Sequence, residues 1–378
     1  MVIGFDGKRA ICNFTGLGNY SRYIISALNT RFPGNSYNIF APRKRENREL
    51  EEILHPNTQL SYPESITGKI FPSLWRSKLI INDLKRRHID LYHGLSNEIP
   101  AGIEKSGIKS IVTIHDLIFL RYPEYYKPAD RKIYDYKFRR ACRTSDRIIA
   151  ISECTKRDIT GFYNIPADKI DVVYQGCHPQ FSQVASEGDK CKVRKIYNLP
   201  ERYILSVGTI EERKNLMLLA KAMKDIPEDI HLVAAGRKTP YAEEVAKYCC
   251  ENRLSERVHM IEGIPFGLLP ALYQQAEMFA YPSRFEGFGI PIIEALSSHI
   301  PVLAATGSCL EEAGGGGALY VNPDDVKSAS EAINRIITDK ELRSSLITAG
   351  KEHIKMFTPE AIADDINEVY RKVTEKSL

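Results

Sequence analysis

The 378-residue sequence lacks three features that would each define a class of protein. It has no long apolar run, because Gly289–Leu296 and Ile300–Ala305 fall far short of the ~18 apolar residues that a membrane-spanning helix needs. Its eight cysteines never occur two residues apart, the spacing of zinc and redox motifs. No Asp-x-Asp triplet occurs, so the usual sign of a metal clamp on a diphosphate is missing. We therefore expect a protein that does not span a membrane and holds no metal.

The first residues also lack the pattern of a secretory leader. Met1–Phe5 is followed at once by the charged Asp6, Lys8 and Arg9, without a long apolar core or a cleavage site. This start predicts a cytoplasmic protein.

Positive charge is concentrated in the first half of the chain. Residues 1–180 contain 28 Lys and Arg against 19 Asp and Glu, whereas the remainder contains 24 against 29. The asymmetry indicates that the first half meets an anionic partner, such as nucleic acid, a phospholipid surface or a charged substrate. No recognition motif for nucleic acid accompanies the charge, so we expect no nucleic-acid partner.

Short apolar runs rich in β-branched residues alternate with helical patterns through both halves, which predicts an α/β fold with two doubly wound, Rossmann-like domains. We place the first domain at 1–180, a polar linker at 181–200 and the second domain at 201–358. A last helix within 359–378 is expected to pack back across the junction. The runs predicted as strands are Val2–Phe5, Tyr37–Ala41, Ile89–His93, Ser110–Ile114, Arg147–Ile151, Ile170–Tyr174, Tyr203–Val207, Ile230–Ala235, Arg257–Ile261, Met278–Tyr281, Pro301–Ala304 and Ala318–Val321.

The first candidate site is a glycine-rich loop. Thr15-Gly16-Leu17-Gly18-Asn19-Tyr20-Ser21 leads into a helical pattern, where glycines let backbone amides approach a phosphate or a sugar. It fails as a dinucleotide fingerprint because Ser21 stands in place of the third glycine. A bare glycine-rich turn is the alternative interpretation.

The second candidate is His115, which follows an apolar strand in Ile114-His115-Asp116-Leu117. Catalytic side chains of α/β folds lie at the ends of strands. A buried structural histidine is the alternative.

The third candidate consists of two loops in the second half, each of which enters a helix. In Val207–Asn215, the adjacent cations Arg213 and Lys214 follow the Gly208-Thr209 turn. They suit a diphosphate, because Arg binds oxygens as a fork and Lys binds them as a point charge. A solvated charged face is the alternative.

The other loop is Ser283–Ala295. Gly287 and Gly289 expose the backbone around Phe288 next to a helix start, which favours phosphate binding. Glu286 and Glu294 are two carboxylates that can accept hydrogen bonds from the vicinal hydroxyls of a sugar or a ribose. Capping carboxylates are the alternative interpretation.

Glu286-Gly287-Phe288-Gly289-Ile290-Pro291-Ile292-Ile293-Glu294 resembles the Glu-x7-Glu signature of retaining glycosyltransferases with the two-domain GT-B fold, in particular family four. The glycine-rich loop, the strand-end histidine and the Gly-Thr-x-x-x-Arg-Lys-Asn loop also occur in the expected order. The resemblance implies two Rossmann-like domains that face each other across a cleft. It also implies transfer of a hexose from a nucleoside-diphosphate sugar with retention and without a cofactor or metal.

The resemblance also implies roles for single residues. Arg213 and Lys214 would stabilise the leaving diphosphate, Glu286 would bind the hydroxyls of the donor sugar, and Glu294 would bind the ribose. The remaining assignments place His115 at the donor sugar near the anomeric centre, Phe288 and Gly289 at the donor phosphate through their amides, Gly208 and Thr209 in the phosphate loop, and Gly16 and Gly18 under the donor.

Substrates follow from the same resemblance. Many family members carry arginine where this chain has Thr209, and Thr is typical of mannosyltransferase-like members. GDP-mannose is therefore the first choice of donor, and UDP-linked sugars are the second. The expected acceptor is a glycan or a lipid-linked glycan in cell-surface polysaccharide synthesis. An epimerase of nucleotide sugars with a similar fold is the alternative enzyme.

Family members commonly act on lipid-linked acceptors, so the basic first half is expected to dock on an anionic membrane surface through residues 43–143. This segment combines cationic runs with aromatic side chains. It would place the protein peripherally at the inner face of the membrane. A cationic face that only aids solubility is the alternative.

Overall fold

The computed structural model describes residues 1–13, 16–45 and 48–375, and the chain divides into two compact units. Unit 1 comprises Met1–Gly176 together with the C-terminal part from Phe357 onward. Unit 2 is the continuous segment Cys177–Met356.

Residues 181–200, predicted as a linker, belong to unit 2, so the first unit ends earlier than the expected residue 180. They include helix α9 (Glu187–Tyr197), which begins after Ser186, whose side chain accepts a hydrogen bond from the Asp189 amide. Along its whole length α9 buries only Val193. The segment looks like a linker in the sequence because a helix with one buried side chain has almost no apolar periodicity.

Unit 1 is built on a seven-stranded parallel sheet in the order β3-β2-β1-β4-β5-β6-β7. Every apolar run predicted in the first half forms a strand. Only β3 is additional, because its sequence Thr-Gln-Leu-Ser has no apolar run. The strands are β1 (Val2–Asp6), β2 (Ser36–Phe40), β3 (Thr58–Ser61), β4 (Leu91–Gly94), β5 (Lys109–Ile114), β6 (Arg147–Ala150) and β7 (Ile170–Val172).

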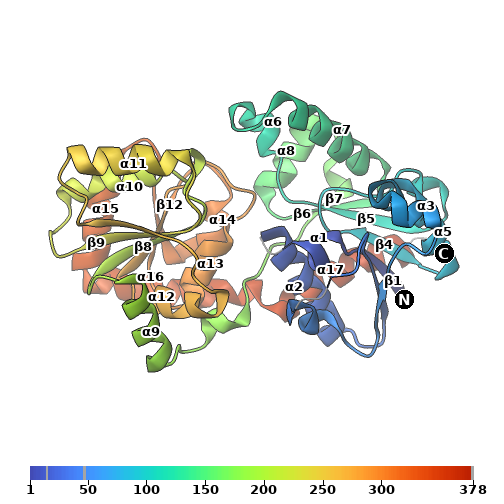
Figure 1. The fold of residues 1–378 in the computed structure, drawn as a ribbon, viewed down its shortest axis with the longest axis horizontal. Coiled ribbons are helices and arrows are strands. Elements are labelled where there is room, and N and C mark those ends of the chain that lie inside the picture. The colour runs from blue at the N-terminus through green and yellow to red at the C-terminus, as the bar shows by residue number, and fades with distance from the viewer. Residues whose placement is uncertain (14–15, 46–47, 376–378) are drawn as a thin grey trace. The chain divides into compact units, whose positions relative to one another are not determined.

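Helices cover both faces of this sheet (Figure 1). The core on one face includes α2 (Gly16–Arg31) and α17 (Pro359–Thr374), and the core on the other includes α5 (Ile80–Arg86), α7 (Pro128–Thr144) and α8 (Glu153–Tyr163). Successive residues of β6, Ile148 and Ile149, fall in opposite cores, as expected for a parallel strand buried on both sides. The shorter helices are α1 (Lys8–Cys12), η1 (Arg48–Ile53), α3 (Ile66–Ile70), α4 (Pro72–Leu74), η2 (Trp75–Leu79), η3 (Ile103–Lys105), α6 (Ile118–Arg121), η4 (Pro123–Tyr125) and η5 (Ala167–Lys169).

The C-terminal helix α17 completes the core of unit 1. Figure 1 shows it beside α2, and its side chains Ile362 and Ile366 are fully buried there. Tyr370 brings its hydroxyl within 2.8 Å of His93 Nδ1 on β4. The last helix therefore belongs to the first unit.

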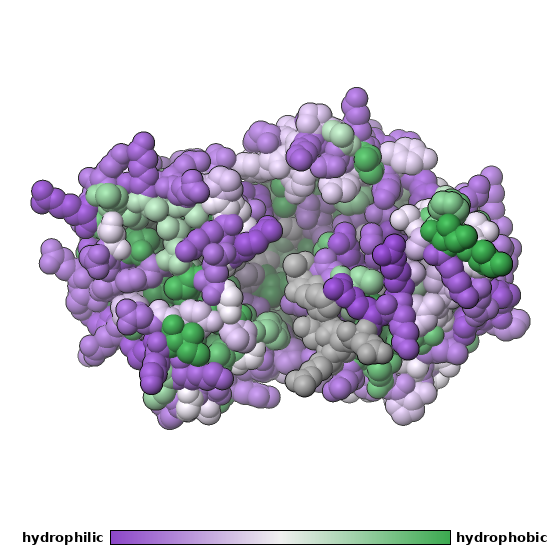
Figure 2. Space-filling view, in the orientation of Figure 1, coloured by the Kyte–Doolittle hydropathy of each residue, from purple (hydrophilic) through white to green (hydrophobic). Residues whose placement is uncertain are grey.

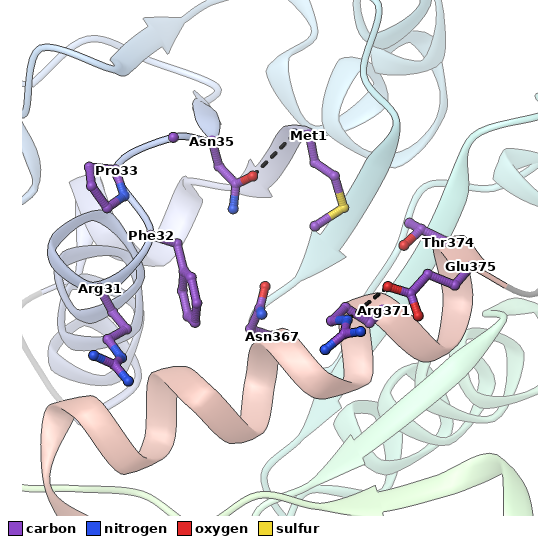
Figure 3. Close-up of a pocket in the computed structure, with 10 residues that line it drawn as sticks. Met1, Arg31, Phe32, Pro33, Asn35, Asn367, Arg371, Thr374 and Glu375 are labelled. Atoms are coloured by element: carbon purple, nitrogen blue, oxygen red, sulfur yellow. Dashed lines mark hydrogen bonds and ion pairs between the residues drawn. The ribbon is translucent and has the colours of Figure 1, made fainter.

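An open groove of about 550 Å³ lies where the end of α2 faces α17 (Figure 3). Met1, which precedes β1, contributes to its lining with Phe32 and Asn367. The groove thus lies at the amino-terminal edge of the sheet, whereas the candidate loops leave the carboxyl-terminal edge. We assign no ligand to it.

The chain crosses between the units twice, and both crossing segments meet Tyr23 of α2 within unit 1. The Tyr23 hydroxyl donates to the Phe357 carbonyl at 3.2 Å. An added Cβ at Gly176 would lie 2.1 Å from the Tyr23 hydroxyl and 2.5 Å from the Phe357 carbonyl oxygen. The crossing at residue 176 therefore has room only for glycine.

Unit 2 has a six-stranded parallel sheet in the order β10-β9-β8-β11-β12-β13. Ile204 of β8 faces a core shared with α10 (Leu216–Ala222), α11 (Pro240–Glu251) and α15 (Val326–Thr338). Tyr203 donates its hydroxyl to the Leu272 carbonyl on α12 (Leu269–Gln274) at 2.6 Å. The strands, which match the predicted runs, are β8 (Tyr203–Val207), β9 (His231–Ala235), β10 (Val258–Ile261), β11 (Met278–Tyr281), β12 (Val302–Ala305) and β13 (Ala318–Val321).

The main helices of unit 2 are α9, α10 (Leu216–Ala222), α11 (Pro240–Glu251), α12 (Leu269–Gln274), α13 (Ile290–Ser297), α14 (Leu310–Gly314), α15 (Val326–Thr338) and α16 (Lys340–His353). Short turns are η6 (Pro179–Ser182), η7 (Glu212–Lys214), η8 (Met223–Asp225), η9 (Phe266–Leu268), η10 (Gly315–Gly317) and η11 (Ile354–Phe357). Throughout the described part of both units, every helix is too short or too polar to cross a bilayer.

Candidate functional site

The two candidate loops of unit 2 are neighbours because their strands are neighbours. Loop 208–215 follows β8, loop 282–289 follows β11, and these two strands pair in parallel. Parallel strands end at the same edge of a sheet, which brings the loops together. The Arg284 amide donates to the Arg213 carbonyl at 2.9 Å and ties one loop to the other.

Glu286 lies between the two cations of the facing loop. Its Oε2 is 2.8 Å from Arg213 Nη1, and its Oε1 is 2.5 Å from Lys214 Nζ. The hydroxyls of Ser283 and Tyr281 donate to Oε1 at 2.7 and 3.1 Å. The three charged side chains are only 13–17% exposed. We call Arg213, Lys214 and Glu286 the ion-pair cluster.

The ion pairs decide the charge state of Glu286. Burial would raise its pKa, but Lys214 and Arg213, together with hydrogen bonds from Lys214 and Ser283, lower it to about 2. Burial lowers the pKa of Lys214, and the Glu286 carboxylate opposes this. The cluster therefore holds two cations that have already lost most of their water. Both pair with Glu286, and Arg213 also pairs with Glu211 at 2.6 Å. An incoming anion would meet them without the full cost of desolvation.

Two glycines shape the backbone under Lys214. Gly208 has φ +143°, and the Lys214 side chain passes 3.6 Å from where its Cβ would be. Gly236, which follows β9, leaves no room for a side chain, since an added Cβ would lie 1.9 Å from the Gly208 carbonyl oxygen. Thr209 follows in the loop and is partly exposed. Sequence analysis missed Gly236, whose only signal is a glycine directly after a strand.

The loop before α13 turns its carbonyl groups toward Cys309. The Cys309 thiol donates to the carbonyl oxygens of Glu286 and Phe288 at 3.0 and 2.6 Å. In a trans peptide the next amide points the opposite way, so the amide of Gly289 points away from Cys309. Gly289 has φ +154°, and its Cβ would lie 3.0 Å from Ala313, so glycine is required there. The Phe288 ring is buried, which leaves only its backbone for a ligand.

Glu294 lies within α13, and the only hydrogen bond of its carboxyl group among the described residues comes from the Tyr273 hydroxyl, to Oε2 at 2.8 Å. Burial raises its pKa to about 7, although the Tyr273 hydrogen bond acts in the other direction. Around neutral pH this carboxyl is therefore poised between its neutral and ionised forms. Its Oε1 remains available to accept a hydrogen bond.

His115 follows β5 in unit 1 and is almost completely enclosed, with 6% exposure. Its Nε2 contacts the Leu95 carbonyl at 2.9 Å, which requires a proton on Nε2, and its Nδ1 is 3.1 Å from the Gln175 amide nitrogen. Burial first, and the charge of Arg9 second, lower its pKa to about 4. Both ring nitrogens of His115 are therefore engaged in hydrogen bonds inside unit 1. Its predicted position at the donor sugar stays a prediction.

The glycine-rich motif forms the first turn of α2 in unit 1. Thr15 lies outside the described residues. Gly18 has no room for a side chain, because an added Cβ would lie 1.8 Å from the Asn13 carbonyl oxygen, whereas the space around Gly16 is open. Two residues further along, the Tyr20 ring packs edge-on against His115, with 4.6 Å between ring centres. The structure thus brings this motif and His115 together.

Both halves of the chain match family models of glycosyltransferases. The family model described as Glycosyltransferase Family 4 matches residues 14–181, and the model described as Glycosyl transferases group 1 matches residues 189–353. The chain is 26% identical over 363 residues to the O-antigen chain mannosyltransferase B of Escherichia coli, with 91% of this chain and 92% of the relative covered. It is 29% identical over 225 residues to the O-antigen chain mannosyltransferase RfbU of Salmonella typhimurium, with 60% of each covered.

The fold is shared with solved structures. Anabaena HepE, solved in complex with UDP and glucose, has a TM-score of 0.74 and 18% identity, with 98% of this chain and 99% of that chain covered. The two family models together span both parallel-sheet units. The chain therefore belongs to the family 4 glycosyltransferases of group 1, which have the GT-B fold.

Proposed function

We propose that this glycosyltransferase transfers mannose from GDP-mannose to a glycan or lipid-linked acceptor in cell-surface polysaccharide synthesis. Both curated relatives described above are named O-antigen chain mannosyltransferases, which supports the choice of sugar and pathway class. The observation that carries the proposal is the ion-pair cluster. Two partly desolvated cations that both bind the Glu286 carboxylate suit a donor that offers a diphosphate and sugar hydroxyls.

In the proposed reaction the donor diphosphate replaces the Glu286 carboxylate as the anion bound by the two cations. The donor diphosphate takes up the contacts of Arg213 and Lys214, and Glu286 turns to accept hydrogen bonds from the hydroxyls of the sugar. Charge that develops on the leaving diphosphate is stabilised by the two cations and by the amide of Gly289. Glu294 Oε1 accepts a hydrogen bond from the ribose.

We propose that transfer proceeds with retention of the anomeric configuration. The carboxylate of Glu286 is engaged by two cations and two hydroxyls, so it is a weak candidate for a covalent nucleophile. His115 has no nitrogen available as a base. These contacts support attack on the same face as the departing phosphate, with the phosphate itself taking the acceptor's proton. The alternative inverting route would require a base that neither residue supplies.

A donor panel tests the proposal. Purified protein is incubated without acceptor with GDP-mannose, GDP-glucose, UDP-glucose and UDP-galactose, and released sugar is measured. We expect GDP-mannose to be hydrolysed fastest, and Lys214→Ala to lower that rate by about 10²–10³ because a charge-stabilising donor is lost. Lys247→Ala, at an exposed pair with Glu251, is the matched control and should be unchanged. UDP sugars are the second candidate, as HepE was solved with UDP; their preferential hydrolysis would overturn the choice of GDP-mannose.

We further propose that unit 1 docks on an anionic membrane surface through residues 43–143. The support is an apolar surface on α3 and α4, where Ile66, Ile70, Phe71 and Leu74 are 78, 62, 58 and 44% exposed. Figure 2 shows hydrophobic side chains gathered over this part of unit 1. The exposed cation Lys69 also lies on α3. Apolar side chains next to cations suit the boundary between lipid headgroups and acyl chains.

Sedimentation with liposomes tests the docking. We expect the protein to pellet with anionic vesicles at low salt, less at high salt, and little with neutral vesicles, because each cation near the surface contributes ~1 kcal/mol. The double variant Ile70→Ser, Phe71→Ser should reduce pelleting at least tenfold. Ile196→Ser, at a 57% exposed position of unit 2, is the control. Equal recovery with both vesicle types, or binding indifferent to salt, would contradict the proposal.

A further inference from the structure

The carboxyl-terminal end of β1 carries positive charge that nearby acids do not neutralise. Asp6 ends this strand and is bound by the Arg76 guanidinium, with Nε at 3.0 and 3.1 Å from its two oxygens. Arg76 also pairs with Glu98 at 3.0 Å, and Lys137 lies 3.4 Å from the same carboxylate. Both acids are therefore already occupied.

Lys8 and Arg9 begin α1, directly after this strand. The acids whose charges act on Lys8 are Asp6 and Glu98, and Arg76 already binds both of them. In the described part of the chain neither side chain forms an ion pair or a hydrogen bond. Arg9 Nε is buried without a partner, an arrangement that costs free energy in the absence of a ligand. Burial, followed by the charges of Arg76 and Arg9, lowers the pKa of Lys8, and the opposing charges of Glu98 and Asp6 do not reverse the shift.

These two cations lie beside the elements that carry the other unit 1 candidates. Arg22 of α2 donates to the carbonyls of Ala10 and Asn13 at 2.9 and 3.0 Å, which fixes α1 against the glycine-bearing helix. An added Cβ at Gly18 would lie 3.1 Å from the Arg9 carbonyl oxygen. The positive charge of Arg9 also contributes to lowering the pKa of His115. The helix that carries the two unpaired cations is therefore held in place at the carboxyl-terminal edge of the unit 1 sheet.

We propose that Lys8 and Arg9 form an anion subsite that binds a phosphate group on the acceptor. A forked guanidinium next to an ammonium group suits phosphate oxygens better than a single carboxylate. The cations proposed for the donor diphosphate are Arg213 and Lys214, so Lys8 and Arg9 are left for the other substrate. The choice of the acceptor as occupant rests on the proposed function, whereas the anion subsite itself does not.

Calorimetric titration with pyrophosphate tests the subsite. The full chain is first saturated with GDP, which fills the proposed nucleotide site, and pyrophosphate is then added. We expect Arg9→Gln to weaken pyrophosphate binding at least tenfold, Arg9→Lys to weaken it less, and Lys105→Ala, an exposed cation elsewhere in unit 1, to leave it unchanged. GDP affinity should change less than twofold in all three variants. Unchanged pyrophosphate binding in Arg9→Gln would overturn the subsite, and a parallel loss of GDP affinity would assign Arg9 to the donor.

Thermal unfolding separates this role from a structural one. Because the ligand-free protein gains nothing from an unpaired cation, Arg9→Gln should keep or raise the melting temperature, whereas Arg76→Gln should lower it by breaking the contacts with Asp6 and Glu98. A lower melting temperature for Arg9→Gln would indicate a structural residue and refute the proposal.

Two further titrations distinguish the sources of the phosphate, one with soluble mannose 1-phosphate and one with vesicles that contain a polyprenyl phosphate. Arg9-dependent binding of either supports the subsite and names its source, and binding of neither overturns the acceptor assignment. If no donor sugar is hydrolysed by the protein but pyrophosphate still binds through Arg9, the proposed function fails and the anion subsite stands.

Discussion

The ion-pair cluster predicts a pH-dependent loss of stability in the variant Glu286→Gln. The pKa of Glu286 falls from an ordinary value near 4.5 to about 2, which corresponds to about 3 kcal/mol of stability at pH 7. Since the folded-state pKa is the lower one, this contribution is complete above pH 4.5 and is lost as the pH falls toward 2. We expect the free energy of unfolding of the wild type to exceed that of Glu286→Gln by about 3 kcal/mol at pH 7 and by about 2 kcal/mol at pH 3.5.

Urea unfolding of both proteins at the two pH values measures this difference. Far-UV circular dichroism follows the whole chain, while fluorescence of Trp75, the single tryptophan, reports on unit 1, which should be unaffected. Glu251→Gln, at a surface pair with Lys247 of 3.9 Å, is the control and should cost no more than ~1 kcal/mol. If the free energies of unfolding of wild type and Glu286→Gln differ by the same amount at pH 7 and pH 3.5, or do not differ at either pH, the electrostatic reasoning is refuted.

Three further predictions concern Glu294, the metal requirement and Gly176. Burial raises the pKa of Glu294 to about 7, so the contribution of this carboxyl to stability is present at low pH and is lost as the pH rises through 7. Glu294→Gln should therefore stabilise the ligand-free protein by up to about 3 kcal/mol at pH 8, and it should weaken nucleotide binding. A destabilised variant at this pH would contradict the reasoning. Transfer should survive EDTA, and loss of activity that Mg²⁺ or Mn²⁺ restores would show that a metal takes part. Gly176→Ala should cost ~1–3 kcal/mol in a denaturation experiment, because its Cβ would overlap the Tyr23 hydroxyl, whereas Gly161→Ala, in open space within α8, should be neutral or stabilising.

The alternation of apolar runs and helical patterns was sufficient to predict two parallel-sheet units, because a strand buried on both faces needs a continuous apolar run. It could not predict β3, an edge strand with the sequence Thr-Gln-Leu-Ser. The pattern predicted that a last helix within 359–378 packs back across the junction, and α17 lies in the core of unit 1. It could not predict α9 within the expected linker, because this helix buries only Val193. The unit boundaries therefore differ from the predicted ones.

For the site, motifs predicted Arg213, Lys214 and Glu286 as separate features of two loops. Their direct contact depends on the pairing of β8 with β11, and strand order is a property of the whole sheet. The enclosure of His115 likewise depends on Gln175, which lies 60 residues away in the sequence. Such pairings have no local signal, so the contacts between these side chains had to wait for the structure.

The return of α17 to unit 1 also has a consequence for synthesis on the ribosome. Unit 2 is one continuous segment, so all its residues have been made before α17 emerges. The core of unit 1 includes Ile362, Ile366 and Tyr370, so it cannot be completed until α17 has left the ribosome. Domains generally fold as units from the N-terminus onward during translation. In this chain the order is reversed: the half that is made first is the last to complete its fold, and until then it exposes an apolar surface that a chaperone can bind.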